Sequence, residues 1–294
     1  MITEIAPARE RESAAPQQPR KVRRAWDEVP RWQIYVPLGI YLVFTLIPFY
    51  WILLFAFRPA GSTSLVPWPM TLDHFQKVWT ERSFGVYFQN SVLVGVATLV
   101  LTTVVALAGG YALARFEFRI KRAFMLALLC SQFVPGALLL VPLFQIFAKL
   151  QMINSLGSVI LAETVFQLPL SMILISGFIR NVPQSLEEAA WVDGCNRFAA
   201  FRIVVLPLLR PGLIAVGSFA FVHAWNHFLF ALMFLSDQSK QTIPVGLNTL
   251  MSADSVDLGA LAAGGIVAAI PVVIVFAFIQ KWLITGFSAG AVKG

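Results

Sequence analysis

The sequence predicts an all-α polytopic membrane protein with six transmembrane helices and one polar helix-turn-helix connection. Of its 294 residues, 58% are hydrophobic and only 13% are charged, whereas soluble domains carry about 25% charged residues. The apolar residues lie in long segments, which as helices can cross a hydrocarbon core roughly 30 Å thick. Residues 183–211 differ, because polar residues and helix-ending signals interrupt the apolar pattern there.

The N-terminal residues 1–31 are unlike the rest of the chain. They contain seven Lys or Arg, five Asp or Glu and no apolar periodicity. Such a segment cannot bury enough apolar surface to fold, so we expect a flexible tail that is disordered at least to Gln18. The domain boundary is placed here, with the tail at residues 1–31 and a six-helix transmembrane domain at residues 32–294, which includes a polar loop at residues 181–211.

The first apolar segment, from about Gln33 to Phe57, has 25 residues. It exceeds the roughly 7 to 15 apolar residues of a signal peptide, so we expect it to stay in the membrane. Residues 58–85 are too polar and too irregular to form a span. The remaining spans are expected at residues 86–114, 123–148, 158–179, 212–235 and 258–282.

Several of these spans contain proline, which can kink a helix whose freed carbonyls are satisfied by neighbouring helices. Two pairs of adjacent glycines, Gly109-Gly110 and Gly264-Gly265, permit close helix approach. Packing alone and a contribution to gating are both compatible with these glycines.

The basic residues indicate which ends of the spans face the cytoplasm. One side of the predicted topology holds 17 Lys and Arg, and the other side holds five. Without the N-terminal tail the difference is ten to five. Cytoplasmic segments carry the excess of basic residues, so we expect both termini and residues 183–211 to be cytoplasmic. Topology then explains the net charge of +7 better than nucleic-acid binding does.

Residues 183–211, termed the knuckle below, carry the signals of two short helices joined by a tight turn. Ser185 and Glu188 are spaced as a capping box, in which each side chain satisfies a backbone N–H at a helix start. This spacing predicts a first helix from Leu186 to Asp193. Gly194 follows, and glycine enters the left-handed conformation of a helix-ending turn without steric cost.

A second knuckle helix is expected from about Asn196 to Val205, ending near Leu206 because Pro207 disfavours a helical residue before it. The knuckle has no core of its own, so its apolar residues are expected to face a partner. These residues are Phe198, Phe201 and Ile203. Capping signals and a turn glycine are also common at helix ends in general, which leaves a purely structural explanation open.

The knuckle resembles a known motif. Glu188-Ala189-Ala190, Gly194 and Leu206-Pro207 have the spacing of the "EAA" loop of binding-protein-dependent ABC importer permeases, with Val204 where that family usually has isoleucine. The resemblance implies that the knuckle docks into a cleft on a separate ATPase subunit and transmits its movement. It assigns this coupling role to Glu188, Ala189, Ala190, Asp193, Gly194, Phe198, Phe201, Leu206 and Pro207.

Residues 224–229, 242–246 and 284–294 resemble the maltose-type sugar permeases of that family, although His227 stands where relatives commonly carry glutamate. The similarity covers residues 33–294 and implies uptake of sugars or related polar solutes. It also implies a second permease subunit, an extracytoplasmic solute-binding protein, and two cytoplasmic ATPase subunits that hold ATP and magnesium. This chain would bind no cofactor and would lie in a bacterial or archaeal cytoplasmic membrane.

Motifs of nucleotide and hydrolytic chemistry are missing from the sequence. It contains no Gly-x-x-x-x-Gly-Lys-Ser/Thr phosphate loop, no Gly-x-Ser-x-Gly motif and no His-Glu-x-x-His motif. The two cysteines, Cys130 and Cys195, fall in a span and in the knuckle, which argues against a disulfide framework. We therefore expect a solute conduit that is not an enzyme and takes its energy from another subunit.

The fifth expected span carries the candidate substrate pathway. His223, Asn226 and His227 have the spacing i, i+3, i+4 and so share one helix face, and Trp225 adds an aromatic surface beside them. Polar groups at this depth normally face a cavity or a partner helix, so hydrogen bonding between helices is an alternative. A zinc site is a third, but two histidines lack the further ligands that zinc needs.

Glu163 is the only acid well inside a predicted span. We find no basic partner at a similar depth, which favours a hydrogen-bonded or water-facing group over a proton relay. An ion-coupled secondary carrier generally has ionisable groups or broken helices in repeated halves, which the sequence does not clearly contain. Such a carrier and a purely structural membrane partner are the alternatives to an ATP-driven importer subunit.

Overall fold

The computed structural model describes residues 30–251 and 256–291, with side chains as far as Gln280. The described residues form helices and loops and include no strand, in agreement with the all-α prediction. Most of the predicted flexible tail, residues 1–29, lies outside the described residues. The chain divides into two compact units, residues 1–50 and 51–294. The arrangement given below is that of the second unit.

Four helices of the described chain are long and apolar enough to cross a membrane. They are α1 (Arg31–Phe57), α3 (Phe84–Arg115), α6 (Leu156–Arg180) and the Leu258–Gln280 part of α13 (Leu258–Ala291). Each coincides with an expected span. The last helix continues beyond residue 282, where the span was expected to end.

The expected span at residues 123–148 is not one straight helix. It consists of α4 (Lys121–Ser131) and α5 (Gly136–Lys149), which are bent by 102° relative to each other. The break precedes Pro135, because proline disfavours a helical conformation in the residue before it. The described residues therefore contain four spans, or up to six if each of two bent helix pairs counts as one. The number six stays a prediction.

The expected span at residues 212–235 is also interrupted, so the prediction of a continuous helix was wrong. α10 (Arg210–Asn226) ends before His227, whose backbone is extended with φ −77° and ψ 121°, and α11 (Leu229–Phe234) follows. Residues 227 and 228 are neither proline nor glycine. We attribute the break to a tertiary contact of the His227 ring, described below. The short helices η3 (Gln238–Lys240) and α12 (Ile243–Met251) complete this region.

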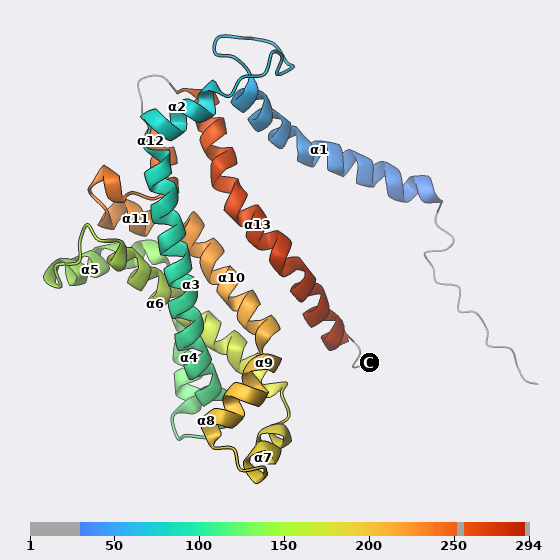
Figure 1. The fold of residues 1–294 in the computed structure, drawn as a ribbon, viewed down its shortest axis with the longest axis vertical. Coiled ribbons are helices and arrows are strands. Elements are labelled where there is room, and N and C mark those ends of the chain that lie inside the picture. Colours follow the sequence, from blue (N-terminus) through green and yellow to red (C-terminus); the bar gives the residue numbers. More distant parts are fainter. Residues whose placement is uncertain (1–29, 252–255, 292–294) are drawn as a thin grey trace, which may run out of the picture. The chain divides into compact units, whose positions relative to one another are not determined.

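The centre of the second unit is the packing of α3 against α6 and α10 (Figure 1). α3 and α6 approach closely at Gly110, where a Cβ atom would lie 2.7 Å from Cγ2 of Ile175 and 3.1 Å from the backbone N of Ser176. Only glycine allows this approach, which supports the packing explanation for the first glycine pair. A Cβ atom on Gly265 of the other pair would have no neighbour within 4 Å.

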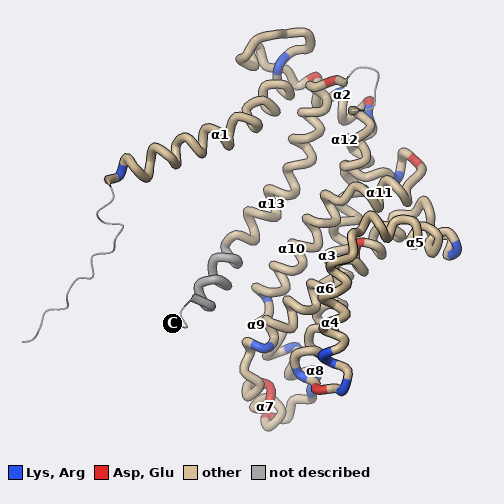
Figure 2. The backbone as a smooth tube through the Cα atoms, turned by 180° about the vertical axis from the view of Figure 1, so that it is seen from behind, with Lys and Arg blue, Asp and Glu red and all other residues tan. Residues whose placement is uncertain are grey.

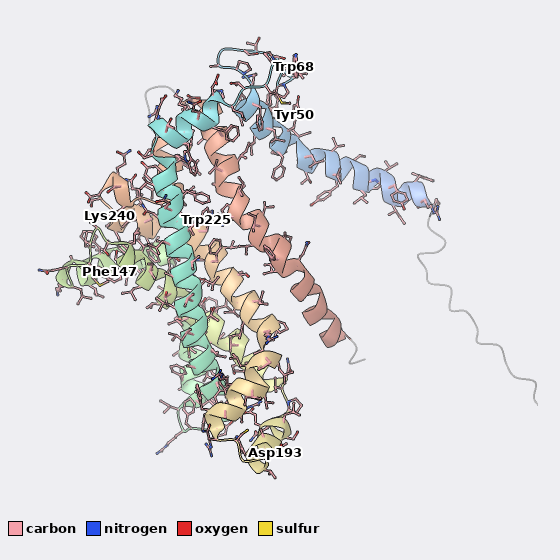
Figure 3. The ribbon with its side chains drawn as sticks, in the orientation of Figure 1. Tyr50, Trp68, Phe147, Asp193, Trp225 and Lys240 are labelled. Atoms are coloured by element: carbon pink, nitrogen blue, oxygen red, sulfur yellow. The ribbon has the colours of Figure 1, made fainter. Side chains whose placement is uncertain are left out.

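Buried apolar side chains form three clusters in this unit. One surrounds Trp225, which points into the packing of α3, α10 and α13 (Figure 3). A second includes Phe147 and Phe234, whose rings meet edge to face with centroids 5.2 Å apart. The third lies next to the knuckle and includes Ile179 and Leu209. The helices that carry both candidate sites are thus held by apolar packing.

Charged residues lie mainly at the two ends of this unit, with few along the helices between them (Figure 2). One end contains α2 (Asp73–Glu81) and Asp257. The other contains the knuckle and the basic segment between α3 and α4, with Arg115, Arg119, Lys121 and Arg122. Such a distribution is expected for helices that cross an apolar layer, because charges in that layer are costly.

Candidate functional site

The first helix of the knuckle is α7 (Gln184–Val192). It starts directly after Pro183, which has φ −57° and ψ 129°, and no side chain caps it. The predicted capping box is therefore wrong: Ser185 lies inside the first turn, where its side chain cannot act as the N-cap. Glu188 consequently does not reach back to the helix start and is exposed on the surface of α7.

The turn after α7 has the conformation predicted from Gly194. Its φ is +88°, which residues with a Cβ atom rarely adopt. The N–H of Gly194 donates to the carbonyl of Trp191 at 3.1 Å, and the N–H of Cys195 donates to that of Ala190 at 2.9 Å. These two bonds form a Schellman motif. Asp193, immediately before the glycine, lies at the tip of the knuckle (Figure 3).

The second knuckle helix is longer than predicted. Asn196 caps it by accepting the N–H of Ala199 at 2.8 Å. The helical path then runs through α8 (Arg197–Ala200), the π turn η2 (Phe201–Val205) and α9 (Leu206–Leu208). It continues into α10 after a bend of 74°, so the knuckle and the helix of the candidate pathway form one path with a single bend.

The π turn explains why this helix does not end before Pro207. The N–H of Leu206 donates to the carbonyl of Phe201, five residues earlier. Proline lacks an N–H, and its ring clashes with the carbonyl four residues earlier in a regular α-helix. A wider turn at this point moves that carbonyl away. The prediction of a helix end near Leu206 was therefore wrong.

The knuckle exposes apolar side chains. Val192, Phe198 and Ile203 are 87%, 73% and 64% exposed. Phe201 was expected on the same surface, but it is half-buried and meets the ring of Tyr111 edge to face, with centroids 5.1 Å apart. Val192 was not among the predicted residues, although its position just before the turn was an available signal. Of the other predicted coupling residues, Ala189 and Pro207 are exposed and Ala190 and Leu206 are half-buried.

Sequence reasoning missed Glu187, the neighbour of Glu188. Glu187 is only 2% exposed, and its oxygens accept hydrogen bonds from Oη of Tyr111 at 2.7 Å and Nε of Arg115 at 2.6 Å. Nη2 of Arg115 also donates to the carbonyl of Val182 at 2.8 Å. Consecutive helical residues point about 100° apart. On a helix with one buried face, two consecutive glutamates therefore differ in exposure, and this was the signal available in the sequence.

The second site is a polar cluster around Glu163 of α6. This side chain is fully buried. It accepts a hydrogen bond from Nδ1 of His223 at 3.1 Å, and Nδ1 of His227 lies within ion-pair distance of its other oxygen. The prediction that Glu163 lacks a basic partner was therefore wrong. Glu163 and His223 are 60 residues apart in the chain, and no local pattern predicts their contact.

His223, Asn226 and His227 line one hollow of about 320 Å³, together with Phe219 and Val222. The structure thus brings together three of the four residues predicted for the substrate pathway.

Trp225 lies elsewhere. It is 2% exposed, its ring stacks on that of Phe221, and its Nε1–H donates to the carbonyl of Ala268 at 3.0 Å. Here the structure shows a packing role, because the polar atom of the indole is already satisfied within the core.

Glu163 determines what the two imidazole rings can offer to a solute. A carboxylate only accepts hydrogen bonds, so Nδ1 of His223 is the donor in its contact with Glu163. Nε2 of each ring is left for another partner and can act as a donor or as an acceptor. The rings of His223 and His227 are nearly parallel, with centroids 5.3 Å apart. Among the described residues, no group of three or more His, Cys, Asp or Glu is arranged to hold a metal ion.

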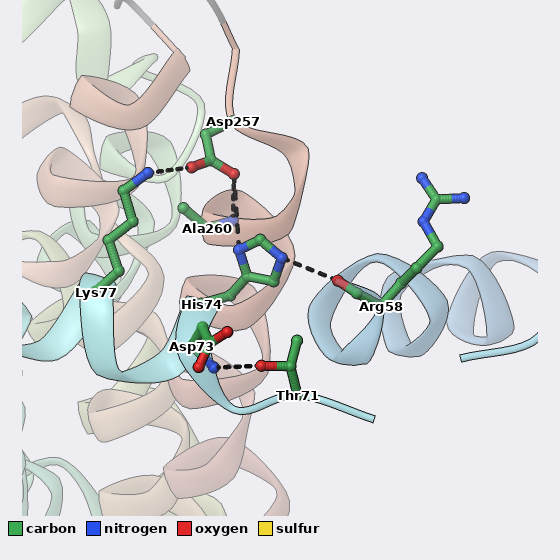
Figure 4. Close-up of polar contacts among 7 residues, drawn as sticks. All are labelled: Arg58, Thr71, Asp73, His74, Lys77, Asp257 and Ala260. Atoms are coloured by element: carbon green, nitrogen blue, oxygen red, sulfur yellow. Dashed lines mark hydrogen bonds and ion pairs between the residues drawn. The ribbon is translucent and has the colours of Figure 1, made fainter. Parts of the chain in front are cut away.

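A third polar cluster ties α2 to the start of α13 (Figure 4). Nζ of Lys77 donates to Asp257 at 2.7 Å, the N–H of Ala260 donates to the same carboxylate at 2.9 Å, and Nε2 of His74 lies 3.0 Å from the carbonyl oxygen of Arg58. Burial raises the pKa of Asp257, but the hydrogen bonds from Lys77 and Ala260 outweigh burial and hold this pKa below its usual value. This cluster connects helices and faces neither of the two candidate sites.

Comparison with known sequences places these features in a family. The family model described as "Binding-protein-dependent transport system inner membrane component" matches residues 106–288. The chain is 36% identical to the diacetylchitobiose uptake system permease protein DasC of Streptomyces coelicolor, over 92% of this chain and 98% of the relative. It is 32% identical to the trehalose transport system permease protein SugB of Mycobacterium tuberculosis, over 85% of this chain and 93% of the relative.

Comparison with solved structures supports the fold. A chain in the crystal structure of a bacterial ABC transporter involved in the import of the acidic polysaccharide alginate superposes with a TM-score of 0.73. The match covers 86% of this chain and 98% of that chain at 20% sequence identity. The alginate ABC transporter in complex with its pentasaccharide-bound periplasmic protein gives a TM-score of 0.67 at 14% identity, over 88% of this chain and 96% of that chain. At these identities the similarity concerns the fold alone.

Proposed function

The chain belongs to the family of binding-protein-dependent transport system inner membrane components, and we propose that it takes up sugars or related polar solutes as one of two different permease subunits. As a member of that family it is a multi-pass membrane permease of an ABC importer and not an enzyme. In the proposed complex an extracytoplasmic binding protein delivers the cargo. Two separate ATPase subunits hold ATP and magnesium, while this chain binds no cofactor.

The observation that carries the proposal is the shape of the knuckle. It lies within the matched residues 106–288, its turn is fixed by the left-handed Gly194, and it exposes the apolar side chains of Val192, Phe198 and Ile203. Exposed large apolar side chains next to polar ones are typical of a protein interface. A rigid joint with exposed apolar side chains is suited to binding an ATPase subunit and following its movement.

The distribution of charge supports the orientation. Lys and Arg residues gather around the knuckle and the segment between α3 and α4 (Figure 2), and an excess of basic residues marks the cytoplasmic side. In this orientation the knuckle and both termini are cytoplasmic, on the side where ATP is available. The cluster of Lys77 and Asp257 is then on the outer side, where the binding protein arrives.

The path from the knuckle to the cargo is short. From Arg197 to Asn226 the chain is helical with one bend of 74°, so a movement of the knuckle displaces α10 directly. α10 carries His223 and Asn226, which border the hollow of about 320 Å³. ATP-driven closure of the ATPase subunits would thereby turn this surface from inward-facing to outward-facing, and ATP hydrolysis would reset it.

The chemistry of the hollow fits a solute with many hydroxyl groups. Nε2 of each histidine can accept or donate, the amide of Asn226 can do both, and a sugar hydroxyl does both as well. Two of the relatives are named for diacetylchitobiose and trehalose uptake, which agrees with this class of cargo. We therefore assign the cargo-facing role to His223, Asn226 and His227 and leave Trp225 in the core.

Purification of the tagged chain from its native membranes tests the proposed function. We expect a second permease subunit and an ATPase subunit to co-purify. In liposomes, uptake of a sugar should require ATP and the binding protein. Uptake by the chain alone, driven by an ion gradient without ATP, would instead identify an ion-coupled secondary carrier and overturn the proposal.

Substitution of His227→Ala and Asn226→Ala tests the cargo-facing role. We expect both to change the order in which different sugars stimulate ATP hydrolysis by the reconstituted complex. Leu232→Ala is the matched control, because Leu232 is exposed on the neighbouring α11 and does not border the hollow. An unchanged order in both variants would assign these residues to helix packing.

A further inference from the structure

The knuckle contains two consecutive glutamates with opposite environments. Glu188 is exposed, whereas Glu187 is 2% exposed. Both carboxylate oxygens of Glu187 are used within the chain, because Oε2 accepts from Tyr111 and Oε1 accepts from Arg115. A buried carboxylate with all its bonds made inside the chain is not available to a partner. Its role must therefore concern the elements of the chain that it connects.

Glu187 connects the knuckle to the end of α3. Arg115 is the last residue of α3 and Tyr111 lies one turn earlier. Arg115 contacts the knuckle region twice, through Nε to Glu187 at 2.6 Å and through Nη2 to the carbonyl of Val182 at 2.8 Å. A guanidinium that uses two donors in fixed directions holds orientation as well as distance.

A cavity interrupts the packing between α3 and part of the knuckle. A cavity of about 730 Å³ is bordered by α3 on one side, for example by Leu107 and Ala108, and by Trp191 and Phe198 of the knuckle on the other. The ring contact of Tyr111 with Phe201 closes one edge. Across this hollow region, the hydrogen-bonded group of Tyr111, Arg115 and Glu187 is the polar connection that joins the two elements.

α3 is the helix through which such a connection reaches the rest of the permease. It packs along α6 and α10 and extends to α2 and α12 at its other end. There Oη of its Tyr87 accepts a hydrogen bond from Nε2 of Gln238 at 2.9 Å. A displacement imposed on the Arg115 end of α3 would therefore be felt across the whole unit.

We propose that Glu187 and Arg115 are positioning residues that transmit movement of the knuckle to α3, while Glu188 faces the ATPase subunit. This inference rests on the proposed function. The two glutamates thus have different roles. Glu188 belongs to the interface with the ATPase subunit, and Glu187 couples the movement of that interface to α3. α10 follows through the chain itself, so the knuckle would drive two helices that pack against each other.

Paired glutamine variants of the complete transporter complex test this division. We expect Glu187→Gln to leave the ATPase subunit bound and ATP hydrolysis active, but to lower the sugar transported per ATP by at least about tenfold, because the charge on Arg115 is left buried without its partner. Glu188→Gln is the matched control and should instead weaken co-purification of the ATPase subunit. Unchanged transport per ATP in Glu187→Gln would overturn the proposal.

Exchange of the two charges provides a second test. Glu187→Arg and Arg115→Glu each place like charges together and should abolish transport, whereas the double variant should recover part of it. Rescue by the double variant identifies the pair itself as the functional element. If both single variants transport normally, the connection has no such role.

A distance measurement within the spin-labelled complex separates transmission from a merely structural role. Spin labels on Val192→Cys and Leu101→Cys, with Cys130 and Cys195 replaced by serine, report the separation of knuckle and α3. We expect this separation to stay constant when nucleotide binds, and to change in Glu187→Gln. A change of several Å without that substitution would overturn the proposal, whereas absence of any bound ATPase subunit would contradict the proposed function instead.

Discussion

Glu163 and Glu187 are both buried, and each is held by two side chains from other helices. Their partners differ in chemistry. Glu187 is paired with Arg115, whose guanidinium only donates hydrogen bonds, whereas Glu163 is paired with His223 and His227, whose rings each have a second nitrogen that can bond another partner. We therefore call the pair at the knuckle permanent and the cluster at the hollow adjustable, because only the cluster can change its hydrogen-bonding pattern.

This difference agrees with the roles proposed for the two groups. A connection that transmits movement must persist through the whole transport cycle, and an arginine–carboxylate pair with two directed bonds does so. A surface that meets a solute must exchange hydrogen bonds with water and cargo, and imidazole rings can reverse the direction of theirs. The comparison leads to predictions that separate the permanent pair from the adjustable cluster.

The largest effect is expected from Arg115→Leu, which breaks the permanent pair. It leaves the Glu187 carboxylate buried without a counter-charge, so the free energy of unfolding should fall by about 3–5 kcal/mol. Thermal unfolding of the purified permease in detergent measures this loss. Combining it with Glu187→Leu should restore most of the stability, because no unpaired charge remains. A double variant as unstable as Arg115→Leu would contradict the explanation.

A smaller effect is expected from Glu163→Gln in the adjustable cluster. The amide oxygen can still accept from one imidazole, so only one contact is lost and the loss should be about 1–3 kcal/mol. The same thermal measurement compares it directly with Arg115→Leu. A loss equal to that of Arg115→Leu would show that the cluster behaves as a permanent ion pair, and the contrast between the two glutamates would fail.

Gly194→Val tests the shape of the knuckle turn separately from the hydrogen bonds of Glu187. A β-branched residue held at φ +88° is strained, by about 1–2 kcal/mol or more, and the Schellman turn should be lost. We expect transport to stop while membrane insertion is retained, as measured by uptake and by membrane fractionation. Gly177→Ala is a suitable control, since a Cβ atom there meets nothing within 4 Å and its φ is not positive. Normal uptake by Gly194→Val would refute the role of the turn.

The smallest effect concerns Asp257, a carboxylate that is partly exposed beside Lys77. Its pKa is lowered in the folded chain, so it contributes stability at pH values above the ordinary aspartate pKa of about 3.9. This contribution is lost as the pH falls through the lowered pKa. Lys77→Met should reduce the loss of stability on acidification in a series of thermal scans, whereas a steeper loss would contradict the assignment.

Local signals in the sequence predicted the features that depend on local chemistry. Apolar length placed four helices, and Gly194 placed the turn, because these depend on hydrophobic burial and on the φ angle of one residue. The break before Pro135 was also a local signal, but a continuous apolar pattern outweighed it in the prediction. The capping box failed because Pro183, just before the expected cap, already starts the helix.

The remaining features depend on contacts between distant segments. The end of α10 at His227 is associated with a carboxylate on α6, and the burial of Glu187 depends on the end of α3. Neither contact has a pattern in the sequence, since each joins residues that are 60 or more positions apart. Of the predicted pathway residues, Trp225 was misplaced because a helix face read from spacing does not show which helices cover it.

The π turn at Phe201–Val205 has one more residue in its turn than an α-helix would use. Each residue rotates a helix by about 100°, so this extra residue sets the angular phase between the exposed apolar side chains of the knuckle and the first turn of α10. Removing one residue from the turn would rotate everything after it and bring the ring of Pro207 back toward the carbonyl four residues earlier. The direction in which His223 and Asn226 point from the helix axis is thus set about twenty residues earlier in the chain.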